Sequence, residues 1–392
     1  MIHTKLQADS NSVQELPQTK NFAIIVSGEI TQVRREAAMR AEKPRIDVIE
    51  LERQHGAQIY DFVWLKERAR HEFLTRRLIA LVGFTHALVL RAFPVLRRMS
   101  AIYATNEDVG LALAALSRMF FLGRQPFLLL RLEQMLFGST RLKRWIYSKY
   151  FRFTMRRVNL TVCRADSHSH LLQRALKLAP ERFITVPEPV DTAFFNRANA
   201  PIEGIVTIPS GAYIVSAGLE MRDYATLIEA VRGLPVQLII GAGSPWSKFT
   251  FDKQLEPPEN VVVSTFDPMQ MRELYRNANL VVVAVHPSRR TCGISVILEA
   301  WSMERAVVAT RTIGLSHYVR DGQNGLFVNP RDPQDMRAKI QLLLTNTSEA
   351  KRLGLNGRQQ VERENAIEKI VVQLNELVQY QLQPDPAEAR VF

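Results

Sequence analysis

The chain has 392 residues, of which 46% are hydrophobic and 23% are charged, and its net charge is +12. This length exceeds what one ordinary hydrophobic core accommodates and favours two domains, while the composition excludes disordered and fibrous proteins. Only two cysteines are present, Cys163 and Cys292, which excludes a disulfide-stapled scaffold and fits a reducing compartment. We therefore expect a cytoplasmic protein.

Two segments of the sequence bear on targeting: the N-terminal 20 residues and the longest apolar run. The first 20 residues lack the charged-then-apolar pattern of a secretory signal, so we expect residues 1–20 to form a disordered polar tail. The longest apolar run, residues 78–90, is short for a bilayer and is flanked by arginines at 76, 77 and 91. We do not expect it to span a membrane.

The first half of the chain predicts a parallel α/β domain over residues 21–195. Short apolar runs alternate there with longer helical patterns, as in a doubly wound sheet. The expected strands are NFAIIVSGEI (21–30), IDVIEL (46–51), AIYAT (101–105), PFLLL (126–130), VNLTVC (158–163) and RFITV (182–186). A looser segment then separates the two halves.

The pattern restarts in a second domain, which we place at residues 205–365. Expected strands lie at 212–218, 236–244, 260–264, 279–285, 306–310 and 326–328, and expected helices lie at 224–232, 269–277 and 294–303. Apolar spacing predicts a final helix over 366–382, and we assign residues 366–392 to this helix, returning to the first domain, and a tail.

Positive charge gathers in the first half, where residues 1–200 hold 31 lysines and arginines against 18 acidic residues. Two basic segments, 66–98 and 141–157, carry much of it, and aromatic residues interleave with the bases in the second. Such a mixture suits an anionic membrane surface, but it also fits nucleic acid or a solvated helix face with its aromatic residues turned inward. We expect the membrane rather than nucleic acid to be the partner.

The strongest chemical signal lies in residues 287–328. An expected strand ends at Val285, and an expected helix begins after Gly293, near Ile294 or Ser295. The first N–H groups of such a helix have no intrahelical partner and carry the positive end of the dipole, so they form a site for an anion such as a diphosphate. Glu299, about one turn further on, is placed to accept hydrogen bonds from ribose hydroxyls, or simply to stabilise the helix start.

This segment resembles the donor-site signature of glycosyltransferase family 4. The matching residues are Gly293, Glu299, Ala300, Gly314 and the turn Asp321-Gly322-Gln323-Asn324-Gly325. The resemblance covers residues 212–345 well, and the first domain through its layout and the segment ITVPEPVDTAFF. Thr291 stands where the family has its first Glu, and His317 stands where it often has another.

The resemblance implies a GT-B fold, with two Rossmann-like doubly wound domains facing across a cleft. It implies a retaining glycosyltransferase, a hexosyltransferase that moves a sugar from a nucleotide-sugar donor to a glycan or lipid-linked acceptor in polysaccharide or glycolipid synthesis. In that scheme the departing diphosphate takes up the acceptor's proton, and no enzymic nucleophile is needed. The basic first domain suggests a peripheral position on the inner face of the cytoplasmic membrane.

A second group of candidate residues follows the expected strands at 212–218 and 236–244. Gly218 closes a turn, and Arg222 is the cation left to hold the donor diphosphate, because Leu219 takes the position of the family's Arg. We expect Arg222 and Glu299 to be catalytic, since a cation at the leaving group stabilises charge that grows there. Gly241 and Gly243 would let the nucleotide approach closely, although Gly-x-Gly is weak evidence alone.

The acceptor side is expected to come from strand ends of the first domain: Gly28, Glu107 and Glu133. No Asp-x-Asp occurs in the chain, and His168 and His170 read as the start of a helix capped by Ser167, so we expect no metal and no cofactor. Three alternatives stay open: a nucleotide-sugar epimerase of the same fold, a noncatalytic basic protein that binds nucleic acid, and a degenerate transferase.

Overall fold

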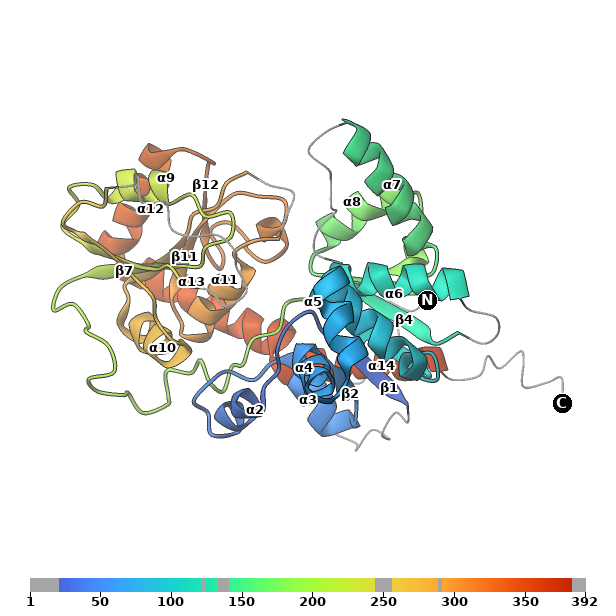
Figure 1. Ribbon diagram of the computed structural model, residues 1–392. Coiled ribbons are helices and arrows are strands. Elements are labelled where there is room, and N and C mark those ends of the chain that lie inside the picture. Colours follow the sequence, from blue (N-terminus) through green and yellow to red (C-terminus); the bar gives the residue numbers. More distant parts are fainter. Residues whose placement is uncertain (1–20, 121–124, 133–140, 244–255, 288–290, 383–392) are drawn as a thin grey trace.

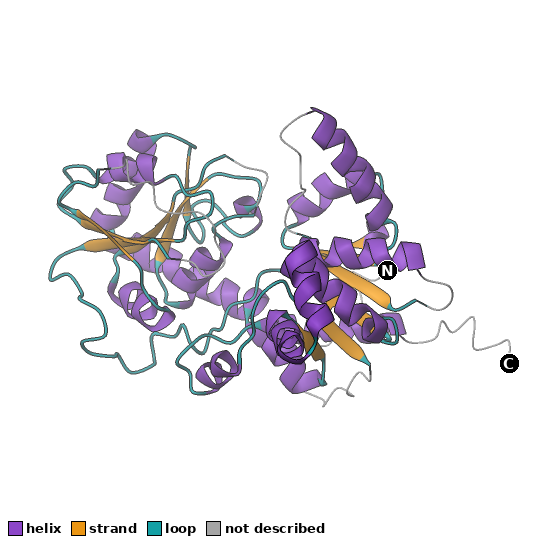
Figure 2. Ribbon diagram, viewed as in Figure 1, coloured by secondary structure: helices purple, strands orange, loops and turns teal. Residues whose placement is uncertain are grey.

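The structure is a computed structural model, and it describes residues 21–120, 125–132, 141–243, 256–287 and 291–382. The polar tail expected at 1–20 lies outside the described residues. The chain forms two lobes, each built around a parallel sheet flanked by helices (Figures 1 and 2). These two sheets confirm the α/β, doubly wound fold expected from the alternation of apolar runs and helical patterns.

The first sheet has six parallel strands in the order β2-β1-β3-β4-β5-β6. Its strands are β1 (Phe22–Ile25), β2 (Gln58–Tyr60), β3 (Ala101–Ala104), β4 (Phe127–Arg131), β5 (Leu160–Cys163) and β6 (Phe183–Thr185). The helices of this part are α2 (Gln32–Met39), α3 (Asp47–His55), α4 (Phe62–His71), α5 (Phe73–Leu96), α6 (Glu107–Phe120), α7 (Arg141–Met155), α8 (Asp166–Leu176) and the short η1 (Pro180–Arg182).

Alternate residues of β1 face opposite layers, as expected for a strand buried on both sides. Ala23 and Ile25 pack with the buried faces of α5, α6 and α8, whereas Phe22 and Ile24 pack with α3 and the C-terminal helix α14 (Ile367–Leu382). The last helix of the chain therefore belongs to the core of the first lobe, to which the chain returns (Figure 1).

The strand expected at IDVIEL is wrong, because residues 47–51 begin α3. Val48 and Leu51 lie three residues apart on the buried helix face, and Gly56 ends the helix in the left-handed conformation. The apparent alternation of polar and apolar residues arises because Asp47 and Glu50 are buried as well, Asp47 in an ion pair with Arg131. The strand beside β1 is instead β2, which the sequence analysis missed.

Helix α5 is 24 residues long, and by length and composition it could cross a membrane. Its backbone is not helical at Gly83, where φ is 75° and ψ is 171°, so two shorter helical segments of about 15 and 20 Å result. A bilayer core is about 30 Å thick. Ala87, Leu88 and Val89 of the second segment are buried in the first lobe.

The second sheet also has six parallel strands, in the order β12-β11-β10-β7-β8-β9. Its strands are β7 (Tyr213–Ala217), β8 (Gln237–Gly241), β9 (Val261–Ser264), β10 (Leu280–Val283), β11 (Ala306–Thr310) and β12 (Leu326–Val328). Its helices are α9 (Tyr224–Val231), α10 (Pro268–Asn277), α11 (Ile294–Ser302), α12 (Pro333–Thr345) and α13 (Thr347–Gln360), with the short elements η2 (Leu315–His317) and η3 (Val361–Asn365). Helices α10 and α11 cover one face, and α9, α12 and α13 pack on the other.

Among the described residues, the lobes contact each other in two regions. Val190 pairs with Asn365 and Ile367 where the two connecting segments cross, and Asp191 there binds Arg45. Further out, the loop after β11 contacts the start of α8: the Tyr318 hydroxyl donates to the carbonyl of Arg164 at 2.6 Å. This second contact joins a carboxyl-edge loop of one sheet to a carboxyl-edge loop of the other.

Candidate active site

The candidate donor residues gather where the strand order of the second sheet reverses. From β7 the chain moves outward to β8 and β9, and then returns to β10 on the other side of β7. Ligands of open α/β sheets bind outside the carboxyl ends of the strands at such a switch point. Gly218 and Arg222 follow β7, and Thr291, Gly293 and Ser295 follow β10, so both loops open at this one point.

Arg222 is held over the turn that follows β7. Its Nε donates to the carbonyl of Ala217 at 2.7 Å and its Nη1 to the carbonyl of Glu220 at 2.9 Å. Gly218 has a φ of 95°, and a Cβ there would lie 2.4 Å from Nη2 of Arg222. Glycine at 218 thus makes room for the guanidinium, which two backbone carbonyls fix in place.

Gly293 caps the start of α11 in a conformation that favours glycine, with a φ of 95°. A Cβ at this position would lie 2.6 Å from the side chain of Val283 and 3.8 Å from Nη1 of Arg222. The Arg222 guanidinium therefore lies beside the helix end. The first hydrogen bond of this turn runs from the N–H of Ile297 to the carbonyl of Gly293, and among the described residues no acceptor is found for the N–H groups of Ile294 and Ser295.

The first two residues of α11 differ in which of their groups a ligand could contact. Ile294 is 4% exposed and its side chain belongs to the core, so only its backbone N–H is available to a ligand. The side chain of Ser295 is exposed. Thr291, just before the helix, is partly exposed. The helix end is therefore open to solvent, next to a fixed guanidinium, as an anion site requires.

Glu299 points from α11 toward α10 rather than standing free in solvent. The residue keeps some exposed surface, but its carboxyl group is desolvated, and the Tyr275 hydroxyl donates to Oε2 at 3.1 Å. Burial raises the pKa of Glu299 from 4.5 to about 7, against the opposing effects of the Tyr275 hydrogen bond and the Arg222 charge. The carboxyl group is thus a weak acid that titrates near neutral pH. Sequence reasoning found Glu299 but missed Tyr275, which only the packing of α10 on α11 brings to it.

Gly241 and Gly243 lie beside the site, for a reason that differs from the expected one. A Cβ on Gly241 would lie 3.0 Å from the sulfur of Met271, and one on Gly243 would lie 2.6 Å from the side chain of Thr265. The carbonyl of Gly241 accepts a hydrogen bond from the N–H of Gly218. Close packing of protein side chains therefore accounts for both glycines. Their direct contact with a nucleotide stays a prediction.

The turn from Asp321 to Gly325 is a structural part of the signature. Asn324 is 3% exposed and binds the carbonyl of Tyr318 and the side chain of Gln360. Asp321 accepts from the N–H of Phe327. This turn fixes the loop between β11 and β12, away from the start of α11.

Two acceptor-side candidates lie at the matching switch point of the first sheet, between β1 and β3. The loop after β1 contains Gly28 and joins the start of α6, because Ser27 donates to Asp108 at 2.5 Å, next to Glu107. Gly28 and Glu107 are therefore brought near one another. Glu133 lies outside the described residues.

The two histidines of α8 differ in exposure. His168 is 3% exposed whereas His170 is exposed, and no group of three or more metal-ligating side chains occurs in the described part of the chain. The helix starts at Asp166, after Ala165, so the cap expected at Ser167 is wrong. Ser167 donates instead to the carbonyl of Ile313 at 2.9 Å, and Asp166 lies 3.6 Å from Nδ1 of His317. Sequence reasoning missed this contact between the lobes, which local patterns do not encode.

Two Rossmann-like lobes, with a helix N-terminus and a cation at the switch point of the second, define the GT-B class of proteins. Residues 210–360 match the family model described as glycosyl transferases group 1. The second lobe is therefore a group 1 glycosyl transferase domain. Membership of family 4 in particular stays a prediction.

Curated relatives match the same part of the chain. An uncharacterized glycosyltransferase of Methanocaldococcus jannaschii is 30% identical over 153 residues, which is 38% of this chain and 41% of that protein. A lipopolysaccharide core biosynthesis glycosyltransferase of Rhizobium meliloti is 33% identical over 163 residues, 42% of this chain and 46% of that protein. The chain thus spans less than half the length of these relatives.

Solved structures match over nearly the whole chain. HepE of Anabaena, in complex with UDP-glucose, superposes with a TM-score of 0.64 at 16% identity, covering 91% of this chain and 99% of that one. A glycosyltransferase of Rickettsia africae gives a TM-score of 0.64 at 11% identity, covering 93% and 100%. At these identities the likeness establishes the fold shared by both lobes.

Proposed function

We propose that the protein is a retaining hexosyltransferase that transfers a sugar from a nucleotide-sugar donor to a glycan or lipid-linked acceptor. The observation that carries the proposal is the open start of α11 beside the fixed guanidinium of Arg222, at the switch point of a group 1 glycosyl transferase domain. HepE, which shares the fold, binds UDP-glucose in its solved complex. These three findings support the proposal of a nucleotide diphosphate at the start of α11.

The chemistry follows from where charge develops. As the bond from the sugar C1 to the diphosphate oxygen breaks, negative charge grows on the diphosphate and positive charge on the sugar ring. The α11 N–H groups and Arg222 stabilise the leaving group more strongly in the transition state than in the ground state. The acceptor oxygen then attacks C1 from the same face, and its proton passes to the departing phosphate oxygen. This scheme requires no metal and no enzymic nucleophile.

Donor binding is tested first with a thermal-shift screen against UDP-, GDP- and ADP-sugars. A ligand at a hundred times its Kd stabilises the folded state by about 2.7 kcal/mol, which a melting curve resolves. If no nucleotide sugar raises the melting temperature, the proposal is wrong. Incubating the active donor alone then separates transfer from epimerisation, because an epimerase would change the sugar without any acceptor.

We further propose that the acceptor is presented at the inner face of the cytoplasmic membrane. The aromatic residues of α7 are not all turned inward: Phe151 is buried, but Trp145 is 61% and Phe153 is 40% exposed. On the first half of α5, Leu74 is 73% and Leu81 is 82% exposed. Basic side chains lie among them, as Lys149 does over the ring of Trp145. Exposed aromatic and apolar groups mixed with cations are typical of surfaces that bind anionic lipid headgroups.

Vesicle co-sedimentation tests this localisation. The protein should bind vesicles containing phosphatidylglycerol at physiological salt and ignore pure phosphatidylcholine vesicles. Trp145→Ser with Leu81→Ser should weaken vesicle binding about tenfold without lowering the melting temperature, because both side chains are exposed. Equal binding to both kinds of vesicle, or none to either, would refute it.

A further inference from the structure

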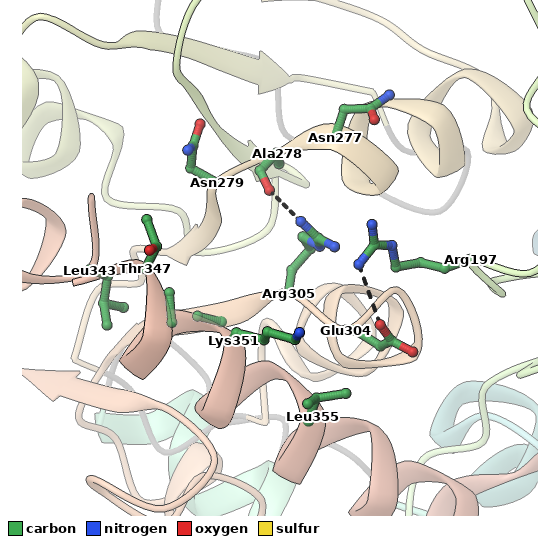
Figure 3. A pocket seen from close by; sticks show the side chains of 12 residues that line it. Arg197, Asn277, Ala278, Asn279, Glu304, Arg305, Leu343, Thr347, Lys351 and Leu355 are labelled. Atoms are coloured by element: carbon green, nitrogen blue, oxygen red, sulfur yellow. Dashed lines mark hydrogen bonds and ion pairs between the residues drawn. The ribbon is translucent and has the colours of Figure 1, made fainter. Parts of the chain in front are cut away.

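A second polar cavity lies at the opposite edge of the second sheet, at the amino ends of β10 and β11. Its volume is about 240 Å³, and its polar lining includes Arg197, Asn277, Asn279, Glu304, Arg305 and Lys351 (Figure 3). The donor candidates lie at the carboxyl edge of the same sheet, after β7, β8 and β10. Helix α11 runs between the donor candidates and this cavity. Gly293 lies at its start, beside the donor candidates, and Glu304 lies two residues beyond its last residue, Ser302, in the cavity lining.

Three cations face this cavity against one carboxylate. Figure 3 shows Arg197 from the connecting segment, Arg305 from the start of β11 and Lys351 from α13 directed toward it. Glu304 pairs with Arg197 at 3.4 Å. After this ion pair, the lining keeps a net positive charge from Arg305 and Lys351. The start of α13, with Thr347 in the lining, adds the positive end of a helix dipole.

Hydrogen bonds within the protein engage only some of the guanidinium donors of Arg305. Its Nε donates to the carbonyl of Met303 and its Nη1 to that of Ala278, both at 3.0 Å, whereas among the described residues no acceptor is found for its Nη2. Burial, and then the nearby charge of Arg197, lower the pKa of Arg305 to about 10. An anion bound between two guanidinium groups reduces the electrostatic repulsion between them.

Tight packing fixes the wall of the cavity. Glu304 has a φ of 57°, and a Cβ on Gly354 of α13 would lie 2.2 Å from the carbonyl oxygen of Glu304. The backbone of Arg197 is held as well, because its carbonyl accepts from Nη1 of Arg276 at 2.7 Å. The charged groups are therefore presented by a rigid frame rather than by a loose surface.

We propose that this cavity, the Arg197–Arg305–Lys351 site, binds the phosphate group of a small phosphorylated molecule or free phosphate. Arginine pairs and a lysine are the groups that recognise phosphate oxygens. The volume is below the roughly 300–1,000 Å³ of pockets for drug-sized ligands, which fits a phosphate with a small substituent. The site is distinct from the donor crevice, so the proposal does not depend on the proposed transfer reaction.

Isothermal titration of the full chain with inorganic phosphate and with glucose 6-phosphate tests the site. The double variant Arg197→Gln with Lys351→Gln should raise both Kd values at least tenfold, since each cation removed takes away a charge-assisted hydrogen bond. The double variant should still fold, because the side chains of Arg197 and Lys351 are exposed. Arg305→Gln is not the variant to rely on, because it also removes two hydrogen bonds to carbonyls.

Two comparisons separate this site from the others. Arg232→Gln with Lys369→Gln removes the same charge from exposed positions outside the cavity and should leave both Kd values unchanged. Ser295→Asp, which blocks the start of α11, should also leave them unchanged. Tighter binding of glucose 6-phosphate than of phosphate would identify a phosphorylated metabolite as the ligand, and equal binding would identify free phosphate. Absence of binding to the wild type, or wild-type Kd values in the Arg197/Lys351 variant, would overturn the proposal.

Discussion

Replacing Ser295 with aspartate should both stabilise the protein and weaken its donor binding. Ser295 is the second residue of α11 and its side chain is exposed. A carboxylate there faces the positive end of the helix dipole and should raise the free energy of unfolding by about 0.3–1 kcal/mol. The same carboxylate would stand beside the donor phosphates, and two unit charges about 4 Å apart repel by about 4 kcal/mol at an effective dielectric constant near 20.

Exposure to solvent and salt reduces that repulsion to roughly 2–3 kcal/mol, which corresponds to donor binding about 30 to 150 times weaker. Donor Kd values and melting temperatures of the same samples measure the two effects. Ser295→Asn is the matched control, since it has the same shape without the charge and should bind donor within a few-fold of the wild type. An aspartate variant that binds donor as the wild type does would refute the placement of the phosphates at α11.

Three further predictions concern the same crevice. Burial raises the pKa of Glu299 from 4.5 to about 7, so between these pH values the folded protein binds more protons than the unfolded chain. The free energy of unfolding therefore falls as pH rises from 5 to 8. Urea unfolding at these two pH values should show a fall that is about 2–3 kcal/mol smaller in Glu299→Gln than in the wild type. Gly293→Ala should lower stability by about 1–3 kcal/mol, against about 1 kcal/mol for Gly233→Ala, because both have positive φ but only Gly293 meets a side chain. Arg222→Lys keeps the charge but loses the paired hydrogen bonds to Ala217 and Glu220, so kcat should fall at least tenfold in a variant that still unfolds cooperatively.

Local sequence patterns predicted most of the fold because buried parallel strands are continuous apolar runs. The runs that became β1, β3 and β7 are fully buried, and a helical pattern follows each of them. The same rule failed at residues 46–51, where an ion pair with Arg131, 84 positions away, allows Asp47 to be buried in a helix. Strand β2 was missed because it is a three-residue edge strand with only Tyr60 buried.

The candidate site was predictable to the extent that one chain segment contains it. The start of α11 follows from a strand, a glycine and an apolar helical pattern in sequence. Asp223, an acidic residue directly before an apolar helical pattern, caps α9 by accepting from the N–H of Thr226. What the sequence could not show is the partner of each polar group. The Tyr275 hydroxyl reaches Glu299 across 24 positions, and the contact between His317 and Asp166 depends on how the two lobes pack.

In the proposed mechanism, the hydrogen bonds of Arg222 allow this arginine to hold the donor diphosphate although Leu219 stands where the family has its Arg. A flexible side chain loses conformational entropy when it binds a ligand, and the loss weakens binding. Here two carbonyls already hold the guanidinium beside Gly293, within reach of the helix end, before any ligand arrives. Because the cation and the α11 N–H groups are fixed in one place, little reorganisation is needed as charge develops on a leaving diphosphate. The neighbouring Glu299 carboxyl, with its raised pKa, carries less negative charge at neutral pH than an ordinary glutamate and so opposes the phosphates less.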